Sequence, residues 1–260
     1  MLSGPQSYAA FLTKERYHPR SNKHGDKLSH LVLADLISSC QPLRTAATQG
    51  KVVYSLNFDV LVADPAVVSG LSPDLLKDLG WNIDLVLGPP KAQQGQIVQA
   101  QPGAVQEAEP DEIWMVLDAK GVMTEHGKAR RNRQRDVTAL SAVMHLFHPS
   151  VVVGAVIPVN IARRFKSPLV DDVTDHGDNI GQVVADTLAI FRAVREVAPR
   201  LATGGIEGLG CFVVDFENTP GFIASLHSGP PAPKAGDVIH YDHFITDLAT
   251  ALVRRCGDKM

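Results

Sequence analysis

Residues 151–159 constrain the fold more than any other segment of the sequence. They form a nearly continuous apolar run, VVVGAVIPV, over the length of a single strand. A strand that keeps one face in water alternates apolar and polar residues, whereas a strand covered on both faces is apolar throughout. The chain therefore has to supply covering layers on both sides of a sheet.

Helical and extended patterns alternate along the rest of the chain. The predicted strands are 52–62, 82–87, 113–120, 151–159 and 211–216. The predicted helices are 26–40, 72–80, 137–147, 180–197 and a C-terminal helix that aligns Phe244, Leu248 and Leu252. Interleaved helices and strands predict an α/β fold, with a central mixed β-sheet flanked by helices, in a single domain over 1–260.

Two segments are predicted to connect these elements without regular structure. Residues 91–111 contain six glutamines, with Gly and Pro and almost no large apolar residue, which is typical of an insertion or loop. The glycine-rich run ATGGIEGLG at 202–210 follows a helix and precedes a strand, the reverse of a dinucleotide-binding turn. A flexible connection is expected there.

Composition excludes several classes of protein. The chain has 25 Lys and Arg against 28 Asp and Glu, and 45% of its residues are hydrophobic, which indicates a globular protein without the bulk charge of a polyanion binder. Cys40, Cys211 and Cys256 are widely spaced and odd in number, so neither a disulfide framework nor a zinc knuckle is expected. Without a signal peptide or a membrane-spanning run, a soluble cytoplasmic protein is expected, with no membrane contact.

Asp118 and Lys120, in VLDAKG, are the most informative charged residues. Because side chains alternate across a strand, both point to one face of an otherwise apolar strand. A buried charge is costly unless it has a partner, a metal or a polar cleft. Asp84 lies on the preceding predicted strand, where pairing would bring it alongside Asp118. The simplest alternative is a salt bridge at a strand end.

Two adjacent carboxylates are ligands that suit Mg²⁺, which binds through one or two carboxylates, keeps several waters and contacts substrate phosphates. Beside such an ion, Lys120 would orient or help deprotonate an attacking water, and the metal would polarise the scissile phosphate. Asp59 is the rival for Asp84, since it also lies in a β-rich run. Asp84 is preferred because its strand is next in sequence to that of Asp118.

This pattern resembles the catalytic motif of the PD-(D/E)xK nuclease superfamily, to which most type II restriction endonucleases belong. The resemblance implies that Asp84 and Asp118 hold metal, that Lys120 is catalytic and that the carbonyl of Ala119 is a further metal ligand. It covers about 82–160, where the strand, strand, helix, strand order of the family recurs. No proline directly precedes Asp84, and the insertion at 91–111 lengthens the spacing to Asp118.

A basic run follows this motif. From 120 to 135 there are six basic residues against one acidic residue, Glu125. Arginine makes bidentate contacts with phosphate and guanine, so the run is interpreted as a DNA contact, the alternative being a solvated charged face. The candidate DNA-binding residues are Lys128, Arg130, Arg131 and Arg133, with Arg163 and Arg164 as a second cluster or a plain charged loop.

Histidine groups elsewhere lack the spacing of a zinc site. His240, Asp242 and His243 form HYDH, and 175–178 has the sequence DHGD. Neither group has the HExxH spacing of a helical zinc site or a paired set of cysteines, so cap and loop roles are expected.

Together these features predict a Mg²⁺-dependent endonuclease that hydrolyses double-stranded DNA, of the type II restriction kind. The resemblance further implies a homodimer, and a cognate methyltransferase encoded nearby would support a restriction role. The glutamine-rich segment is a candidate groove-reading element, because Gln can bond adenine. The alternatives are a repair, recombination or RNA-directed nuclease of the same superfamily, and a non-catalytic nucleic-acid-binding module.

Overall fold

In the computed structural model, the residues described are 3–63, 72, 79–91, 105–169, 172–198 and 205–260. Most of the predicted helix at 72–80, most of the glutamine-rich segment and residues 202–204 of the glycine-rich run lie outside this part of the chain. All five predicted strands and the other four predicted helices lie within it.

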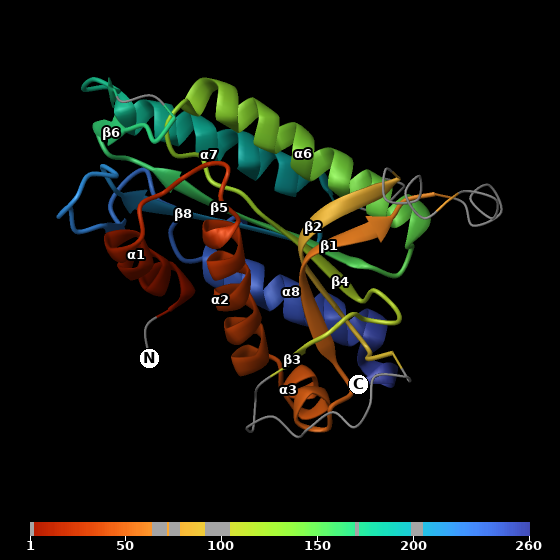
Figure 1. The fold of residues 1–260 in the computed structure, drawn as a ribbon. Coiled ribbons are helices and arrows are strands. Elements are labelled where there is room, and N and C mark those ends of the chain that lie inside the picture. Colours follow the sequence, from red (N-terminus) through yellow and green to blue (C-terminus); the bar gives the residue numbers. More distant parts are fainter. Residues whose placement is uncertain (1–2, 64–71, 73–78, 92–104, 170–171, 199–204) are drawn as a thin grey trace.

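A seven-stranded mixed sheet forms the centre of the fold (Figure 1). In spatial order its strands are β3 (Gln106–Glu107), β1 (Val53–Leu61), β2 (Gly80–Gly88), β4 (Met115–Ala119), β5 (Val152–Asn160), β8 (Gly208–Asp215) and β9 (Ser225–His227). The central strands β4, β5 and β8 are parallel, while β1, β2 and β4 form an antiparallel meander. A separate hairpin joins β6 (Arg164–Lys166) to β7 (Val173–Asp175).

Helices cover both faces of the sheet (Figure 1). One layer consists of α6 (His126–Phe147) and α7 (Ile180–Val197). The opposite layer contains α1 (Gly4–Lys14), α2 (Lys23–Ser39), α3 (Gln41–Thr48) and α8 (Tyr241–Cys256), which continues into η2 (Gly257–Lys259). All of β5 is buried, and its residues divide between the two cores, with Val152 and Val156 in one and Val153 and Ala155 in the other. The α/β fold and its mixed sheet are confirmed.

Several predicted elements coincide with observed ones. The predicted helix at 180–197 is α7, and the strand predicted at 151–159 is β5 within one residue. In the C-terminal helix, Phe244, Leu248 and Leu252 are buried as expected. All three cysteines are free and buried, and none of the described helices is long and apolar enough to cross a membrane.

The glycine-rich connection predicted up to Gly210 is wrong at its C-terminal end. Gly208 and Gly210 belong to β8, which packs directly against α8. A Cβ added to Gly208 would lie 2.8 Å from Leu248, and one added to Gly210 would lie 2.7 Å from Phe244. These glycines therefore permit close approach of helix and strand, and they do not mark a flexible loop.

Other differences arise from contacts that local patterns do not reveal. The described end of the glutamine-rich segment forms β3, because its backbone pairs with the edge of β1. Helix α6 begins at His126, well before the predicted start at 137, so the basic run lies within the helix. The N-terminal helix α1 was not predicted; it begins with a Ser3 capping box and buries Tyr8 and Leu12.

Candidate active site

The candidate site lies where two strands of the sheet separate. The antiparallel pairing of β2 with β4 ends at Leu85 and Leu117. One residue further along this register, Asp84 stands opposite Asp118. The Ala119 amide, which has lost its partner strand at this point, donates instead to Oδ2 of Asp84 at 2.7 Å. A carboxylate thus replaces the missing backbone acceptor at the fork between β2 and β4.

The hairpin of β1 and β2 is twisted at the same point. Asn57 is the residue of β1 that the register sets opposite Asp84, and this pair is missing from an otherwise continuous ladder. Asn57 has a φ of 49°, in the left-handed region. In a regular strand, Leu56 and Phe58 would both point to the face of the sheet opposite Asn57. Here they pack against different cores, one on each face of the sheet.

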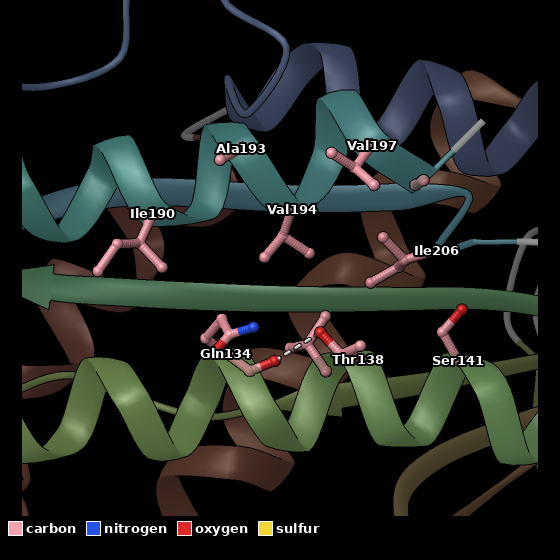
Figure 2. Close-up of a pocket in the computed structure, with 10 residues that line it drawn as sticks. Gln134, Thr138, Ser141, Ile190, Ala193, Val194, Val197 and Ile206 are labelled. Atoms are coloured by element: carbon pink, nitrogen blue, oxygen red, sulfur yellow. Dashed lines mark hydrogen bonds between the residues drawn. The ribbon is translucent and has the colours of Figure 1, made fainter. Parts of the chain in front are cut away.

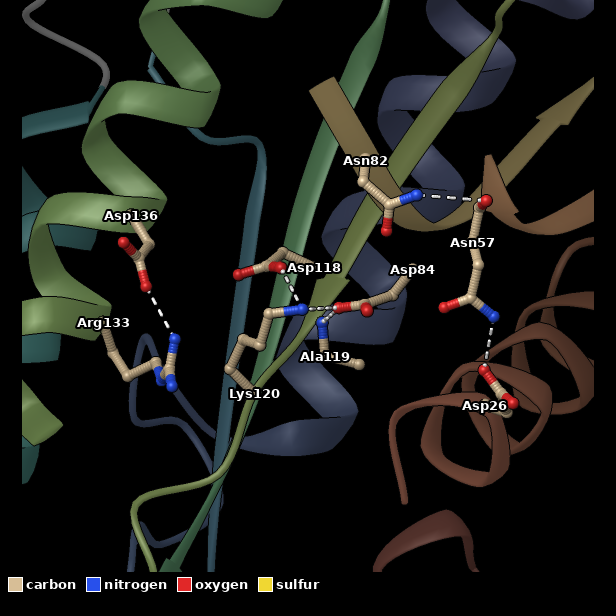
Figure 3. A network of polar contacts seen from close by, with 9 residues as sticks. All are labelled: Asp26, Asn57, Asn82, Asp84, Asp118, Ala119, Lys120, Arg133 and Asp136. Atoms are coloured by element: carbon tan, nitrogen blue, oxygen red, sulfur yellow. Dashed lines mark hydrogen bonds and ion pairs between the residues drawn. The ribbon is translucent and has the colours of Figure 1, made fainter. Parts of the chain in front are cut away.

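Lys120 joins the two carboxylates (Figure 3). Its Nζ lies 2.6 Å from Oδ2 of Asp84 and 3.2 Å from Oδ1 of Asp118. The Asp84 and Asp118 side chains are 11% and 13% exposed, and that of Lys120 is 34% exposed, so only the lysine reaches solvent to a substantial extent. The prediction that Asp118 and Lys120 share a face and lie beside Asp84 is confirmed.

The electrostatics of the three groups are coupled. Burial raises the pKa of Asp118 to about 6; Lys120 opposes this rise and the nearby Asp84 carboxylate adds to it. Burial by itself would lower the pKa of Lys120, but Asp118 and Asp84 together raise it above its ordinary value. The lysine therefore stays protonated at neutral pH, and Asp118 is ionised only above about pH 6.

The fork also presents oxygen atoms suited to a hard cation. A Cβ placed on Gly25 of α2 would lie 3.6 Å from both the Ala119 carbonyl oxygen and Oδ1 of Asp84, so the two oxygens border one space that a glycine leaves open. Carboxylate and carbonyl oxygens are ligands of the kind that Mg²⁺ prefers, and Asp118 supplies a second carboxylate on the other side of Lys120 Nζ. No cluster of three or more His, Cys, Asp or Glu side chains able to hold a metal occurs in the described part of the chain. A cation here would accordingly rely on two carboxylates, a carbonyl and water.

Comparison with protein-family models, curated proteins and solved structures gives no match. The chemistry of the site therefore has to be argued from its own residues.

Asp59, the rival for Asp84, lies outside the fork. It is exposed on β1, where its Oδ1 accepts a hydrogen bond from Nδ2 of Asn82 at 2.9 Å. Asn82 also donates to the Asn57 carbonyl at 3.1 Å (Figure 3). Asp59 supports the twisted hairpin and does not contact Asp118 or Lys120.

The basic run divides into two faces of α6. Arg133 lines the pocket at Lys120, with its NH1 2.7 Å from Oδ2 of Asp136. Arg130 turns toward α7, 4.0 Å from Asp186. The remaining cations share an exposed stripe at helical spacing: Lys128, Arg131 and Arg135. Only Arg133 of the predicted DNA-binding set is thus brought to the carboxylates.

The second basic cluster lies on the β6–β7 hairpin. Arg163 pairs with Asp175 at 3.4 Å and with Asp178 at 2.6 Å, so acidic neighbours offset its charge. Arg164 is exposed. The 175–178 group therefore supports a loop, as predicted, and His240 caps α8 by accepting from the Asp242 amide.

A separate cavity of about 370 Å³ lies between α6 and α7 (Figure 2). Its lining is mostly apolar, including Val137, Ile190 and Val194, and contains no charged side chain. Its hydroxyl groups, from Thr138 and Ser141, have no acid or base in the lining to activate them, so the fork remains the candidate site.

The N-terminal residues that line the site were not predicted from the sequence. The connection between α1 and α2 covers the fork, and Tyr17, His18 and His24 line a pocket with Asp84 and Lys120. The cluster of histidine, arginine and tyrosine in KERYHPRSNKH was the only signal available. Nothing in its spacing indicates that it folds onto strands 60 to 100 residues away.

Proposed function

We propose that this protein is a Mg²⁺-dependent endonuclease that hydrolyses phosphodiester bonds of double-stranded DNA, similar to the type II restriction enzymes. The observation that carries the proposal is the placement of Asp84, Asp118 and Lys120 within one fork of the sheet. Two carboxylates and a lysine at such a position are expected for metal-assisted phosphoryl chemistry.

The order of elements around the fork adds support. β2, β4, α6 and β5 occur in this order along the chain, with the two-residue edge strand β3 between β2 and β4; β2 is antiparallel to β4, and β5 is parallel to it. This is the strand, strand, helix, strand order expected from the resemblance to the PD-(D/E)xK superfamily. α6 follows the fork directly and carries the basic residues.

The role of each side chain follows from its charge and contacts. Bound Mg²⁺ would supply Lewis-acid polarisation of the phosphate and a more acidic water. Asp84, Asp118 and the Ala119 carbonyl would hold it. Its pKa is raised by the two carboxylates, so Lys120 would act as a cation that orients water and offsets negative charge on the phosphate.

Plasmid cleavage tests this proposal. Supercoiled plasmid is incubated with the protein and Mg²⁺, and Asp118→Asn and Lys120→Met are compared with wild type. Loss of one group that acts in the transition state is expected to slow cleavage by about 10²-fold or more. Asp59→Asn is the matched control, since it neutralises a nearby carboxylate outside the fork, and it should cut at the wild-type rate.

Three outcomes would overturn the assignment: a wild-type protein that cuts no DNA, variants that cut as well as wild type, or an Asp59→Asn variant as impaired as Asp118→Asn. Binding of DNA without cleavage would instead favour a non-catalytic nucleic-acid-binding module, in which Lys120 only neutralises two buried carboxylates. Faster cleavage of RNA, or of branched DNA, would favour the RNA-directed or repair alternatives.

A two-fold symmetric dimer would place one such site on each strand of a duplex, so we further propose a homodimer. Light scattering after size-exclusion chromatography is expected to give twice the mass of the 28.0 kDa chain. Discrete fragments, in place of a smear, and a methyltransferase gene next to this one would support a restriction role.

A further inference from the structure

A pocket of about 180 Å³ lies directly beside the candidate site. Its floor contains Asp84, Ala119 and Lys120, and its walls come from the α1–α2 connection and from Arg133 of α6. The pocket thus joins parts of the chain that are more than 100 residues apart. Its position, continuous with Lys120, lets a group bound there extend into the fork.

Three polar groups of this pocket have no hydrogen-bond partner in the described part of the chain. The Tyr17 hydroxyl makes no such bond, and Nε of Arg133 is buried without one. His24 is 4% exposed; its Nε2 faces the Arg16 carbonyl at 3.0 Å and therefore donates, which leaves the buried Nδ1 as an unused acceptor. Buried polar groups normally have partners, so the unpaired Nε donor of Arg133 and the unpaired Nδ1 of His24 indicate a ligand.

The donors of the pocket favour a ligand that accepts hydrogen bonds. Lys120 and Arg133 each bring a positive charge beside the Asp84 carboxylate; Lys120 is paired with Asp84 and Asp118, and Arg133 is paired with Asp136. Burial raises the pKa of Tyr17, and Arg133 and Lys120 oppose that rise. Tyr17 consequently remains a neutral hydroxyl donor at neutral pH. A phosphate oxygen accepts hydrogen bonds from both guanidinium and hydroxyl groups.

We propose that Tyr17 and Arg133 bind one phosphate of the strand that is cut, and so position that strand at Lys120. The inference rests on the proposed nuclease function for the identity of the ligand as nucleic acid. Tyr17 lies outside the motif through which the chain resembles nucleases, and its role comes from the pocket alone. Both side chains are positioning residues, since neither contacts the reacting atoms.

Binding without catalysis tests the pocket. A fluorescein-labelled 16-base-pair DNA duplex is titrated in EDTA and followed by anisotropy at several salt concentrations. Tyr17→Phe removes one neutral donor and is expected to weaken binding several-fold without changing the salt dependence. Arg133→Gln is expected to weaken binding about tenfold and to reduce the salt slope by about one. Arg133→Lys should restore the slope but not the full affinity.

Two variants serve as matched controls. Tyr54→Phe removes a hydroxyl of β1 that contacts His30 of α2, and Arg254→Gln removes an exposed arginine of α8. Neither should alter duplex binding. Thermal unfolding of each variant separates loss of affinity from loss of fold.

The outcomes distinguish the two proposals. If wild type cuts DNA but Tyr17→Phe and Arg133→Gln bind and cut as wild type does, the pocket inference is wrong and the nuclease function stands. If wild type cuts nothing in Mg²⁺ while both variants still bind the duplex more weakly than the controls, the phosphate pocket stands and the nuclease function is wrong. When cleavage occurs, a rise in KM with little change in kcat for Tyr17→Phe supports a positioning role.

Discussion

Asp118 is a buried carboxylate whose ionised form is required by the proposed function but is unfavourable for folding. Burial raises its pKa from 3.8 to about 6 in the folded state, whereas the unfolded chain releases this proton near the ordinary value. Between these two pH values the folded state holds more protons than the unfolded state. The free energy of unfolding therefore falls as the pH rises from about 4 to 6.

Asp118→Asn is expected to remove this pH dependence and to stabilise the protein at pH 7 by on the order of 1 to 3 kcal/mol. Lys120 keeps Asp84 as its partner in the variant. Urea denaturation at pH 4, 5, 6 and 7 measures the effect, and cleavage should be lost at the same time. A variant less stable than wild type at pH 7 would show that the pairing with Lys120 outweighs the burial of Asp118.

Gly25 provides a second test at a single residue. An alanine methyl there would fit without a clash, 3.6 Å from Asp84 Oδ1 and from the Ala119 carbonyl oxygen, and would fill the space proposed for the cation. Because Gly is a poor helix residue, Gly25→Ala should raise stability by up to about 1 kcal/mol. It should also raise the Mg²⁺ concentration required for half-maximal cleavage.

Gly181→Ala is the matched control for Gly25→Ala. Gly181 lies in the first turn of α7, and a Cβ added there meets no atom within 4 Å. A similar gain in stability without a change in Mg²⁺ dependence is expected. An identical Mg²⁺ dependence for both variants would argue against a cation beside Gly25.

The hairpin of β1 and β2 is twisted at one residue, opposite Asp84 of the fork. Asn57 has a φ of 49°, and its side chain donates to Asp26 Oδ1 of α2 at 2.9 Å. Asparagine tolerates this conformation better than alanine, and glycine adopts it without strain. This hydrogen bond connects the twisted part of β1 to α2, the helix that covers the site.

Asn57→Ala is expected to lower the free energy of unfolding by about 1 to 2 kcal/mol, since it forces a left-handed conformation on a residue with a Cβ. Asn57→Gly should be the less destabilised variant, although it also loses the bond to Asp26. Chemical denaturation and the cleavage rate should give the same order: wild type, Gly, Ala. If the alanine variant matches or exceeds the glycine variant, the conformation of Asn57 does not control the site.

One exposed stripe of α6 carries three basic side chains, although the whole chain has a net charge of −3. Lys128, Arg131 and Arg135 form this stripe, next to the pocket that contains Arg133. A helix surface of this length can follow several phosphates of a duplex, while the pocket holds one. Association with DNA should therefore depend strongly on salt in spite of the acidic total.

Replacing Lys128, Arg131 and Arg135 together by glutamine is expected to reduce the salt slope of duplex binding by about three, close to one for each lost phosphate contact. The control variant replaces three exposed basic residues elsewhere in the chain by glutamine: Lys14, Lys51 and Arg254. Equal slopes for the two triple variants would mean that the stripe is only a solvated face.

Local patterns in the sequence determined the elements and the candidate chemistry. The apolar run at 151–159 predicted a strand covered on both faces, and β5 is buried along its whole length. The alternation of side chains predicted that Asp118 and Lys120 share a face. Such patterns report periodicity and burial within a few residues, which is why they predicted element types and failed at Gly208 and Gly210, where α8 decides the packing.

Only the tertiary structure decided which residues meet. In the tertiary structure, β2 separates from β4 at Asp84, and Asp59 lies outside this fork. Arg133, but not Arg131, lines the pocket at the site, and Tyr17 lines it together with Lys120. Each outcome depends on strand register, on a twist at one asparagine and on packing between distant segments. These contacts depend on both partners at once, so no pattern within either segment contains them.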